Sequence, residues 1–323
     1  MRLLLWIGLL LLCSASPMSL SASAEVNDFF YPFSRSDLLQ GQPPIIGGCP
    51  RYTVKEEDTL LDIARDFDIG FNELHSLHPE LATWMPTPGR NIAIPRRWIL
   101  PLPSQDPRGH EVVINIAEMR LFLFNFSREL IRSYPVGIGT AKNPTPTGVF
   151  TIREKVEDPV WTVPPGLEDK YDTSQIDPGE DNPLGRYWLG LEDSHYGIHG
   201  TNLAWSVGRA STHGCIRLYP EDISRIFPKL NPSTRVQIVY QPVKFGIRKG
   251  ELMVEVHPDV YDRIDDLTVH AYQLLQERDL LSLADMNKLR VALQRKSGCP
   301  VSVSASPPPE TSESDPNTSQ HSS

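Results

Sequence analysis

The sequence has few long apolar runs, little clustered positive charge and little cysteine. Its longest apolar run, Leu3–Leu12, is far shorter than the ~20 residues of a membrane-spanning helix, so no segment is expected to cross a bilayer. The 31 lysines and arginines are outnumbered by 40 aspartates and glutamates, for a net charge of −9. An acidic chain without basic clusters argues against a nucleic acid partner.

The N-terminal segment has the pattern of an export signal. Arg2 is the only charge before Glu25, an apolar run follows it, and small residues occupy positions 22–24. This pattern predicts a secretory signal peptide over 1–24 that is removed before Glu25. Leu12 precedes Cys13, where lipoprotein processing needs a small residue, so lipidation is not expected.

Cysteine usage singles out one thiol. The chain has four cysteines, and loss of Cys13 with the signal leaves Cys49, Cys215 and Cys299. An odd number in an oxidising compartment raises the question of which cysteine stays unpaired. Because Cys49 and Cys299 both lie between glycine and proline in turn-like surroundings, we expect them to form a disulfide and Cys215 to remain free.

Composition and pattern divide the chain into segments. Thirty prolines and 21 glycines indicate many turns and short strands, and therefore a mainly β protein. The expected segments are a linker over 25–50, a small α+β module over 51–95, a proline-rich linker over 96–109, a β-patterned domain over 110–240, a strand and helical region over 241–299, and a disordered tail over 300–323. A long polar insertion around 156–186 interrupts the β domain, and loops of that length are usually functional and often act as lids.

Residues 51–95 have the pattern strand, helix, helix, strand. The first helix shows an amphipathic stripe, and its residues are Leu60, Ile63, Ala64 and Phe67. Asp58 or Thr59 could cap its N-terminus. The segments YTV, DTL, IA, EL, HP, PG and IP follow one another as in a LysM module, which this segment resembles. The resemblance implies binding to peptidoglycan glycan. The alternative is a small docking domain that binds no sugar, since Glu57 and His78 replace the usual loop residues.

The segment STHGCIR, at 211–217, presents the free thiol. A nucleophilic cysteine needs a nearby base, donors for an oxyanion, and backbone freedom. Gly214 provides the freedom, and the N–H of Cys215, with that of Gly214 or His213, could form the oxyanion hole. The candidate base is His199, which is followed by Gly200 in YGIHGT. Pairing with histidine is expected to lower the pKa of the thiol.

These motifs resemble a known family. HGT at 199–201 followed by STHGCIRL at 211–218, together with TPTGVF at 145–150, is similar to the signature of the YkuD-type L,D-transpeptidases. The resemblance spans about 110–240, and with the preceding module the chain resembles the ErfK/YbiS/YcfS/YnhG group. It implies a YkuD-type β-sandwich catalytic domain and a periplasmic, Gram-negative setting.

The same resemblance implies a two-step acyl transfer on peptidoglycan tetrapeptide stems, without a metal or other cofactor. Cys215 would be the nucleophile, forming a thioester with release of D-alanine, and His199 would be the proton acceptor and donor. The acceptor amine belongs to diaminopimelate on another stem, or to a lysine of an outer-membrane lipoprotein. Thr212 and His213 would shape the loop, and Arg217 would bind a stem carboxylate or pair with a structural acid.

Other interpretations remain open. A zinc site could use His195, His199, His213 and Cys215, although two histidines four residues apart on a strand are about 13 Å apart. The chain could also be a non-catalytic wall-binding protein or an L,D-carboxypeptidase. A papain-like protease usually has its cysteine before its histidine. The aromatic residues Trp161, Tyr187 and Tyr196 fit either a cleft or the core.

Overall fold

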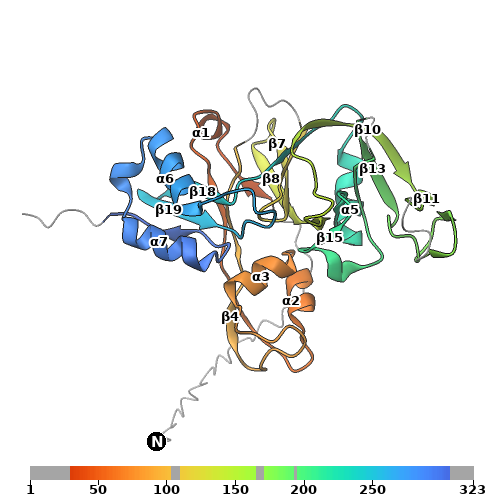
Figure 1. Cartoon of the computed structure of the whole chain (residues 1–323), viewed down its shortest axis with the longest axis horizontal. Helices are drawn as coiled ribbons and strands as arrows, with labels where there is room; N and C mark the ends of the chain where they lie inside the picture. Colours follow the sequence, from red (N-terminus) through yellow and green to blue (C-terminus); the bar gives the residue numbers. More distant parts are fainter. Residues whose placement is uncertain (1–29, 103–109, 165–170, 193–194, 306–323) are drawn as a thin grey trace, which may run out of the picture.

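The computed structural model describes residues 30–102, 110–164, 171–192 and 195–305. The expected signal peptide lies outside these residues. Figure 1 shows three regions: a central sheet, a small N-terminal module below it, and a C-terminal region at the left. None of the helices in the described part of the chain has both the length and the apolar content needed to span a bilayer.

The central sheet has nine strands, in a mixed arrangement. Their order across the sheet is β1 (Tyr31–Pro32), β8 (Leu130–Pro135), β7 (Arg120–Asn125), β6 (His110–Asn115), β17 (Arg235–Val239), β10 (Gly148–Glu157), β13 (Tyr187–Leu191), β14 (Gly197–His199) and β16 (Ile216–Arg217).

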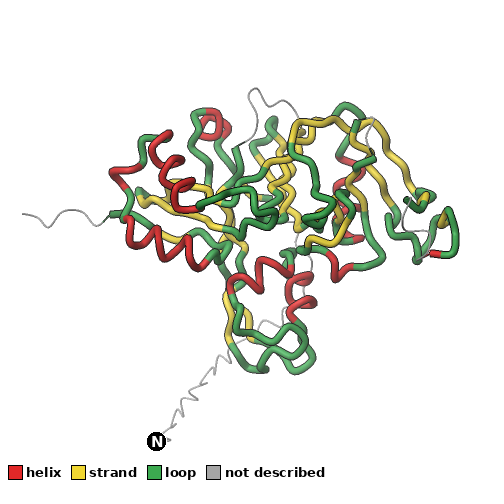
Figure 2. Tube along the Cα trace, in the orientation of Figure 1, coloured by secondary structure: helices red, strands yellow, loops and turns green. Residues whose placement is uncertain are grey.

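The sheet curls at β10. The first part of β10, Gly148–Thr151, pairs with β17, and its second part, from Ile152 to Glu157, pairs with β13 on the other edge. The structure therefore has one curled sheet, and the strands on both sides of β10 contribute residues to the same buried core. The predominantly β character agrees with the prediction, and Figure 2 shows the bend in the strands.

One face of this sheet packs against helix α5, Pro220–Ile226. The helix begins with proline, and Glu221 and Asp222 lie in its first turn, as the sequence predicts. Short elements complete the domain: β9 (Ile138–Gly139), β11 (Trp161–Thr162), β12 (Gln175–Ile176), β15 (Ala210–Thr212), and the 3-10 turns Ala204–Ser206 and Phe227–Lys229.

The N-terminal module follows the predicted order. Its elements are β3 (Arg51–Thr53), α2 (Leu60–Asp66), α3 (Phe71–Leu77) and β4 (Asn91–Ala93). Thr59 caps α2, because its hydroxyl accepts the N–H of Asp62. Asp58, the other candidate for this cap, instead accepts bonds from Tyr52 and Lys55.

The module packs directly on the domain that contains the central sheet. Glu73 of α3 forms a fully buried ion pair with Arg120 of β7, and Arg65 of α2 pairs with Glu221 of α5. A Cβ on Gly208 would lie only 2.4 Å from the backbone nitrogen of Phe71. Gly208 belongs to the loop that connects the His199 and Cys215 segments, so the module supports that loop.

Both expected linkers contain ordered elements. Segment 25–50 contributes β1, α1 (Arg35–Leu39) and β2 (Ile45–Gly48), and segment 96–109 contributes β5 (Arg96–Ile99). Phe33 packs edge-on against Phe124, and β2 pairs with β5. These elements are too short to show periodicity in sequence, and distant strands stabilise them.

The C-terminal region packs two helices on a small sheet. Its elements are β18 (Val243–Arg248), β19 (Glu251–Val256), α6 (Leu267–Glu277), the 3-10 turn Leu281–Leu283, α7 (Met286–Arg295) and β20 (Val301–Ser302). Residues 300–305 of the expected tail are therefore ordered, and the rest of that segment lies outside the described residues. Val303 is fully buried and its N–H donates to the carbonyl of Leu252, which attaches this segment to the sheet.

Candidate active site

The parallel pairing of β14 with β16 positions the two main candidates. In this register Ile198 lies opposite Ile216, and His199 opposite Arg217. Cys215 directly precedes β16, and the alternation of side chains along a strand, continued by one residue, places it on the same face as Arg217. On this argument His199 and Cys215 are diagonal neighbours, although sixteen residues separate them in sequence.

His199 is buried and held by backbone. Its Nδ1 lies 2.6 Å from the carbonyl oxygen of Gly200, which can only accept, so Nδ1 carries the proton and Nε2 is left as a base. The ring lies near that of Trp188, with centroids 5.8 Å apart. Burial, and next the charge of Arg217, lower the pKa of His199 to about 3, against the opposing effect of the Gly200 and Leu184 carbonyls. The imidazole is therefore neutral at physiological pH.

Cys215 is a neutral thiol in this environment. Its Sγ is half-buried and donates to the carbonyl of His195 at 3.7 Å. Burial raises the pKa of Cys215, and the N–H of Gly197 and the charge of Arg217 offset this only in part. The expectation of a lowered thiol pKa is therefore wrong for this structure, because desolvation outweighs the favourable partners and His199 is uncharged.

The loop before the thiol is fixed by one hydroxyl. Thr212 Oγ1 donates to the carbonyl of Cys215 at 2.6 Å and accepts the N–H of Gly214 at 3.1 Å. The N–H of Gly214 is therefore engaged, which leaves those of Cys215 and the exposed His213 as candidates for an oxyanion hole. Gly214 has φ +109°, and a Cβ there would lie 2.4 Å from the ring of Tyr196. Only glycine fits this position without rearrangement.

Arg217 extends the site toward the insertion. Burial lowers its pKa, and the charges that act back on it are those of Cys215 and Tyr171. Among the described residues no carboxylate lies within ion-pair distance of Arg217. Tyr171 packs edge-on against Trp161, with ring centroids 4.9 Å apart. The sequence did not single out Tyr171, because its proximity to Arg217 depends on how the insertion folds.

The other predicted aromatic and glycine positions divide between core and site. Tyr187 packs on Phe227 with ring centroids 4.5 Å apart and lies against the core. Of the two interpretations, cleft or core, the core position is therefore correct for Tyr187. Tyr196 covers Gly214 and lies at the site. A Cβ on Gly200 would come within 3.1 Å of Ile223 in α5, so a small residue is needed beside His199.

The side chains considered for zinc do not converge. His195 and His213 are exposed, whereas His199 is buried. Within the described residues, ligand atoms that lie within 4.8 Å of one another are instead supplied by Glu118, Glu255 and His257.

That second cluster already contains a cation. The ammonium of Lys244 lies 2.8 Å from Glu118 and 3.0 Å from Glu255, and His257 contacts Glu255 at 2.7 Å. Lys244 also donates to the carbonyl of Ile99 in β5. The cluster therefore joins the catalytic domain, β5 and the C-terminal region, with lysine supplying the positive charge.

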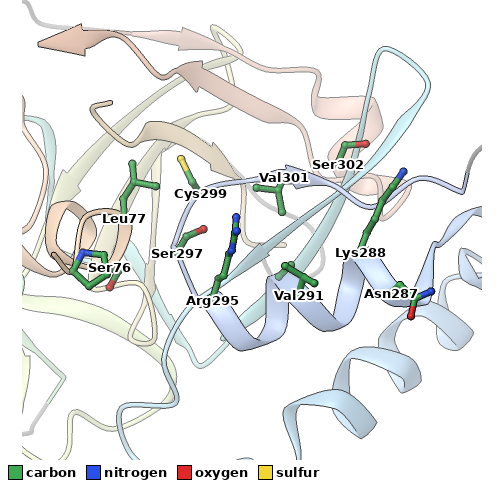
Figure 3. A pocket seen from close by; sticks show the side chains of 12 residues that line it. Ser76, Leu77, Asn287, Lys288, Val291, Arg295, Ser297, Cys299, Val301 and Ser302 are labelled. Atoms are coloured by element: carbon green, nitrogen blue, oxygen red, sulfur yellow. The ribbon is translucent and has the colours of Figure 1, made fainter. Parts of the chain in front are cut away.

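The two cysteines expected to pair lie together. Cys49 and Cys299 are thiols in the structure, with their sulfur atoms 3.5 Å apart. The hydrogen bond from Cys299 lowers the pKa of Cys49 to about 6. Cys299 also lines a groove of about 690 Å³ between α3 and α7, and Cys215 is not among the lining residues. Figure 3 shows Leu77 and Arg295 among the side chains that line it.

Comparison with known proteins identifies the family. Residues 109–238 match the YkuD L,D-transpeptidase catalytic domain. The chain is 30% identical over 306 residues to the probable L,D-transpeptidase YcfS of Escherichia coli, covering 90% of this chain and 92% of that protein. It is 32% identical over 277 residues to the probable L,D-transpeptidase ErfK/SrfK of the same organism, covering 81% and 88%.

Solved structures show a more distant similarity. An L,D-transpeptidase from Mycobacterium smegmatis aligns with a TM-score of 0.34 and 21% identity, covering 41% of this chain and 59% of that one. On the sequence relatives, the chain belongs to the L,D-transpeptidase family. Its members are cysteine-dependent acyltransferases that act on peptidoglycan stem peptides, and this chain is such an enzyme.

Proposed function

We propose that the protein transfers peptidoglycan tetrapeptide stems through a thioester on Cys215, with His199 as proton acceptor and donor. The observation that supports this proposal is the β14–β16 register, in which His199 lies opposite Arg217, two residues after Cys215. The carbonyl of Gly200 beside Nδ1 favours the tautomer with its proton on Nδ1, which makes Nε2 of His199 the candidate proton acceptor.

In the first step, Nε2 of His199 accepts the Sγ proton as sulfur attacks the carbonyl carbon of the L,D bond. The N–H of Cys215 stabilises the oxyanion, joined by that of His213. The C–N bond then breaks, and the imidazolium returns its proton to the departing amine of D-alanine. Because both groups start neutral, the proton moves during the attack rather than before it.

In the second step, an amine attacks the thioester. It loses a proton to His199, the C–S bond breaks, and the thiolate of Cys215 recovers that proton. A diaminopimelate amine gives a cross-link, whereas a lipoprotein lysine tethers that protein to the wall. Attack by water would make the enzyme an L,D-carboxypeptidase.

Arg217 supports binding of an anionic donor. It lies on the face of Cys215, it has no acidic partner among the described residues, and its charge acts on both Cys215 and His199. A carboxylate of the stem peptide would supply the missing counter-charge and add a charge-assisted hydrogen bond.

The setting we propose is the periplasm, after removal of residues 1–24, with the N-terminal module holding glycan as a LysM module. The loop between α3 and β4 supports this role, because Trp84 and Met85 are 67% and 82% exposed there. Exposed aromatic rings of this kind suit the apolar faces of sugars.

The test is intact-protein mass spectrometry of residues 25–323 with disaccharide-tetrapeptide, beside Cys215→Ala. The expected adduct equals the substrate minus D-alanine and is absent from the variant. A cross-linked dimer among the soluble products identifies the stem amine as acceptor, and free tripeptide identifies water. Folded protein with a free Cys215 thiol that forms neither adduct nor product would refute the proposal.

A further inference from the structure

Tyr261 lies outside the matched catalytic domain, which ends at residue 238. Its side chain contacts two residues that hold the nucleophile loop, the segment 212–215 that leads to Cys215. Its hydroxyl donates to the carbonyl of Gly139 at 2.7 Å and accepts the N–H of Thr145 at 3.2 Å. Thr145 in turn accepts the N–H of Gly139 and donates to the carbonyl of Gly214, both at 2.9 Å. We call these four residues the loop network.

The loop network fixes the peptide plane that precedes the thiol. The carbonyl of Gly214 and the N–H of Cys215 belong to one planar trans peptide and point in opposite directions. Holding the carbonyl on Thr145 therefore sets the direction of the N–H that we assign to the oxyanion. Gly139, Thr145 and Gly214 are tightly packed, since a Cβ on Gly139 would lie 2.7 Å from the nitrogen of Thr145 and 2.9 Å from Cα of Gly214.

Tyr261 is itself held firmly. Its N–H donates to the hydroxyl of Tyr240 at 3.0 Å, and that hydroxyl donates to Asp259. The two tyrosine rings stack at 5.8 Å with an interplanar angle of 17°, and the guanidinium of Arg263 lies over both. Asp259 also accepts the N–H groups of Arg263 and Ile264. These contacts fix the position of the Tyr261 hydroxyl beside Gly139 and Thr145.

We propose that Tyr261 is a positioning residue for acyl transfer, and that the segment after the catalytic domain completes the active site through it. The inference depends on the proposed role of Cys215. Tyr261 acts through Gly139 and Thr145 on the oxyanion donor and has no contact with Sγ. Its loss is therefore expected to slow attack on a carbonyl without changing the thiol as a nucleophile.

The central variant is Tyr261→Phe, which keeps the stacked ring and removes only the hydroxyl. The matched control is Tyr272→Phe, because Tyr272 is 43% exposed on α6. We expect Tyr261→Phe to lower kcat for tetrapeptide about tenfold with KM within about twofold, the scale of one lost hydrogen bond at the reacting group. The control should match wild type.

Iodoacetamide alkylation of Cys215 distinguishes positioning from general damage. Alkylation forms no oxyanion, so Tyr261→Phe should react at the wild-type rate while thioester formation slows. Thr145→Val should reproduce the selective loss, and Thr145→Ser, which keeps the hydroxyl, should restore it. Wild-type kcat in Tyr261→Phe, or an equal loss in both reactions, would overturn the proposal.

Amide hydrogen exchange provides a readout that needs no activity. In Tyr261→Phe the N–H of Thr145 loses its acceptor, so its exchange should accelerate, and that of Gly139 should follow. Should wild type form no thioester, the proposed function fails, yet these rates still test the loop network. Unchanged exchange at Thr145 would show that Tyr261 does not hold the loop.

Discussion

Arg120 and Glu73 form an ion pair with a separation of 2.7 Å and almost no solvent exposure, and it joins the catalytic sheet to the N-terminal module. The carboxylate also accepts the indole N–H of Trp98 and the backbone N–H of Gly70. A buried charge is tolerable only when its partners are all in place. The fold is therefore stable only when the N-terminal module is oriented so that Glu73 meets Arg120.

Replacing one partner of the Arg120–Glu73 pair should lower the free energy of unfolding more than replacing both. Arg120→Met leaves the carboxylate buried without its cation, and we expect a loss of about 3–5 kcal/mol in the free energy of unfolding. Adding Glu73→Gln should recover part of this loss, because the amide is neutral. The exposed pair of Arg186 with Glu157 is the control, and Arg186→Met should leave the free energy of unfolding nearly unchanged. Urea denaturation of wild type, Arg120→Met, Glu73→Gln and the double variant measures the coupling, and additive losses would contradict it.

The pH dependence of the reaction follows from the neutral pair. His199 has its pKa lowered to about 3, so it stays an unprotonated base as pH falls through the ordinary range near 6.5. The pKa of Cys215 is raised, so the thiol stays protonated through neutrality. We expect kcat/KM to show no step near pH ~6.5.

The rate of alkylation of Cys215 reports directly whether its thiol is protonated. In a Cys49→Ser/Cys299→Ser background, the iodoacetamide rate at Cys215 should rise about tenfold per pH unit from neutrality to above pH ~8.5, as the thiolate fraction grows. A rate that is already constant between about pH 5 and 7 would mean a thiolate–imidazolium pair, which requires the opposite shifts.

The sequence was most informative where signals are local. The apolar stripe and the two candidate cap residues, Asp58 and Thr59, located α2. The direction of the Cys215 pKa shift was not predictable, because it depends on burial by distant strands. The role of Tyr261 was equally inaccessible, since its partners Thr145 and Gly139 lie 116 and 122 residues away in the chain.

Cys49 and Cys299 are expected to form a disulfide under oxidising conditions. With its pKa lowered to about 6, Cys49 supplies the thiolate that exchanges with a disulfide donor. Thiol titration of the unfolded, oxidised protein should find one free thiol, that of Cys215. Closing so long a loop should stabilise the fold by up to about 5 kcal/mol. Dithiothreitol should destabilise wild type but not Cys49→Ser/Cys299→Ser, and three free thiols would contradict the pairing.

Thr212 offers a test of the nucleophile loop that spares the reacting groups. Thr212→Val removes the hydroxyl that bridges the carbonyl of Cys215 and the N–H of Gly214. Leaving these buried groups unpaired should cost about 1–3 kcal/mol of stability, and the displaced loop should lower kcat roughly 10- to 100-fold. Thr212→Ser keeps the hydroxyl and should retain most activity. Equal kcat in the valine and serine variants would mean that the backbone alone holds the loop.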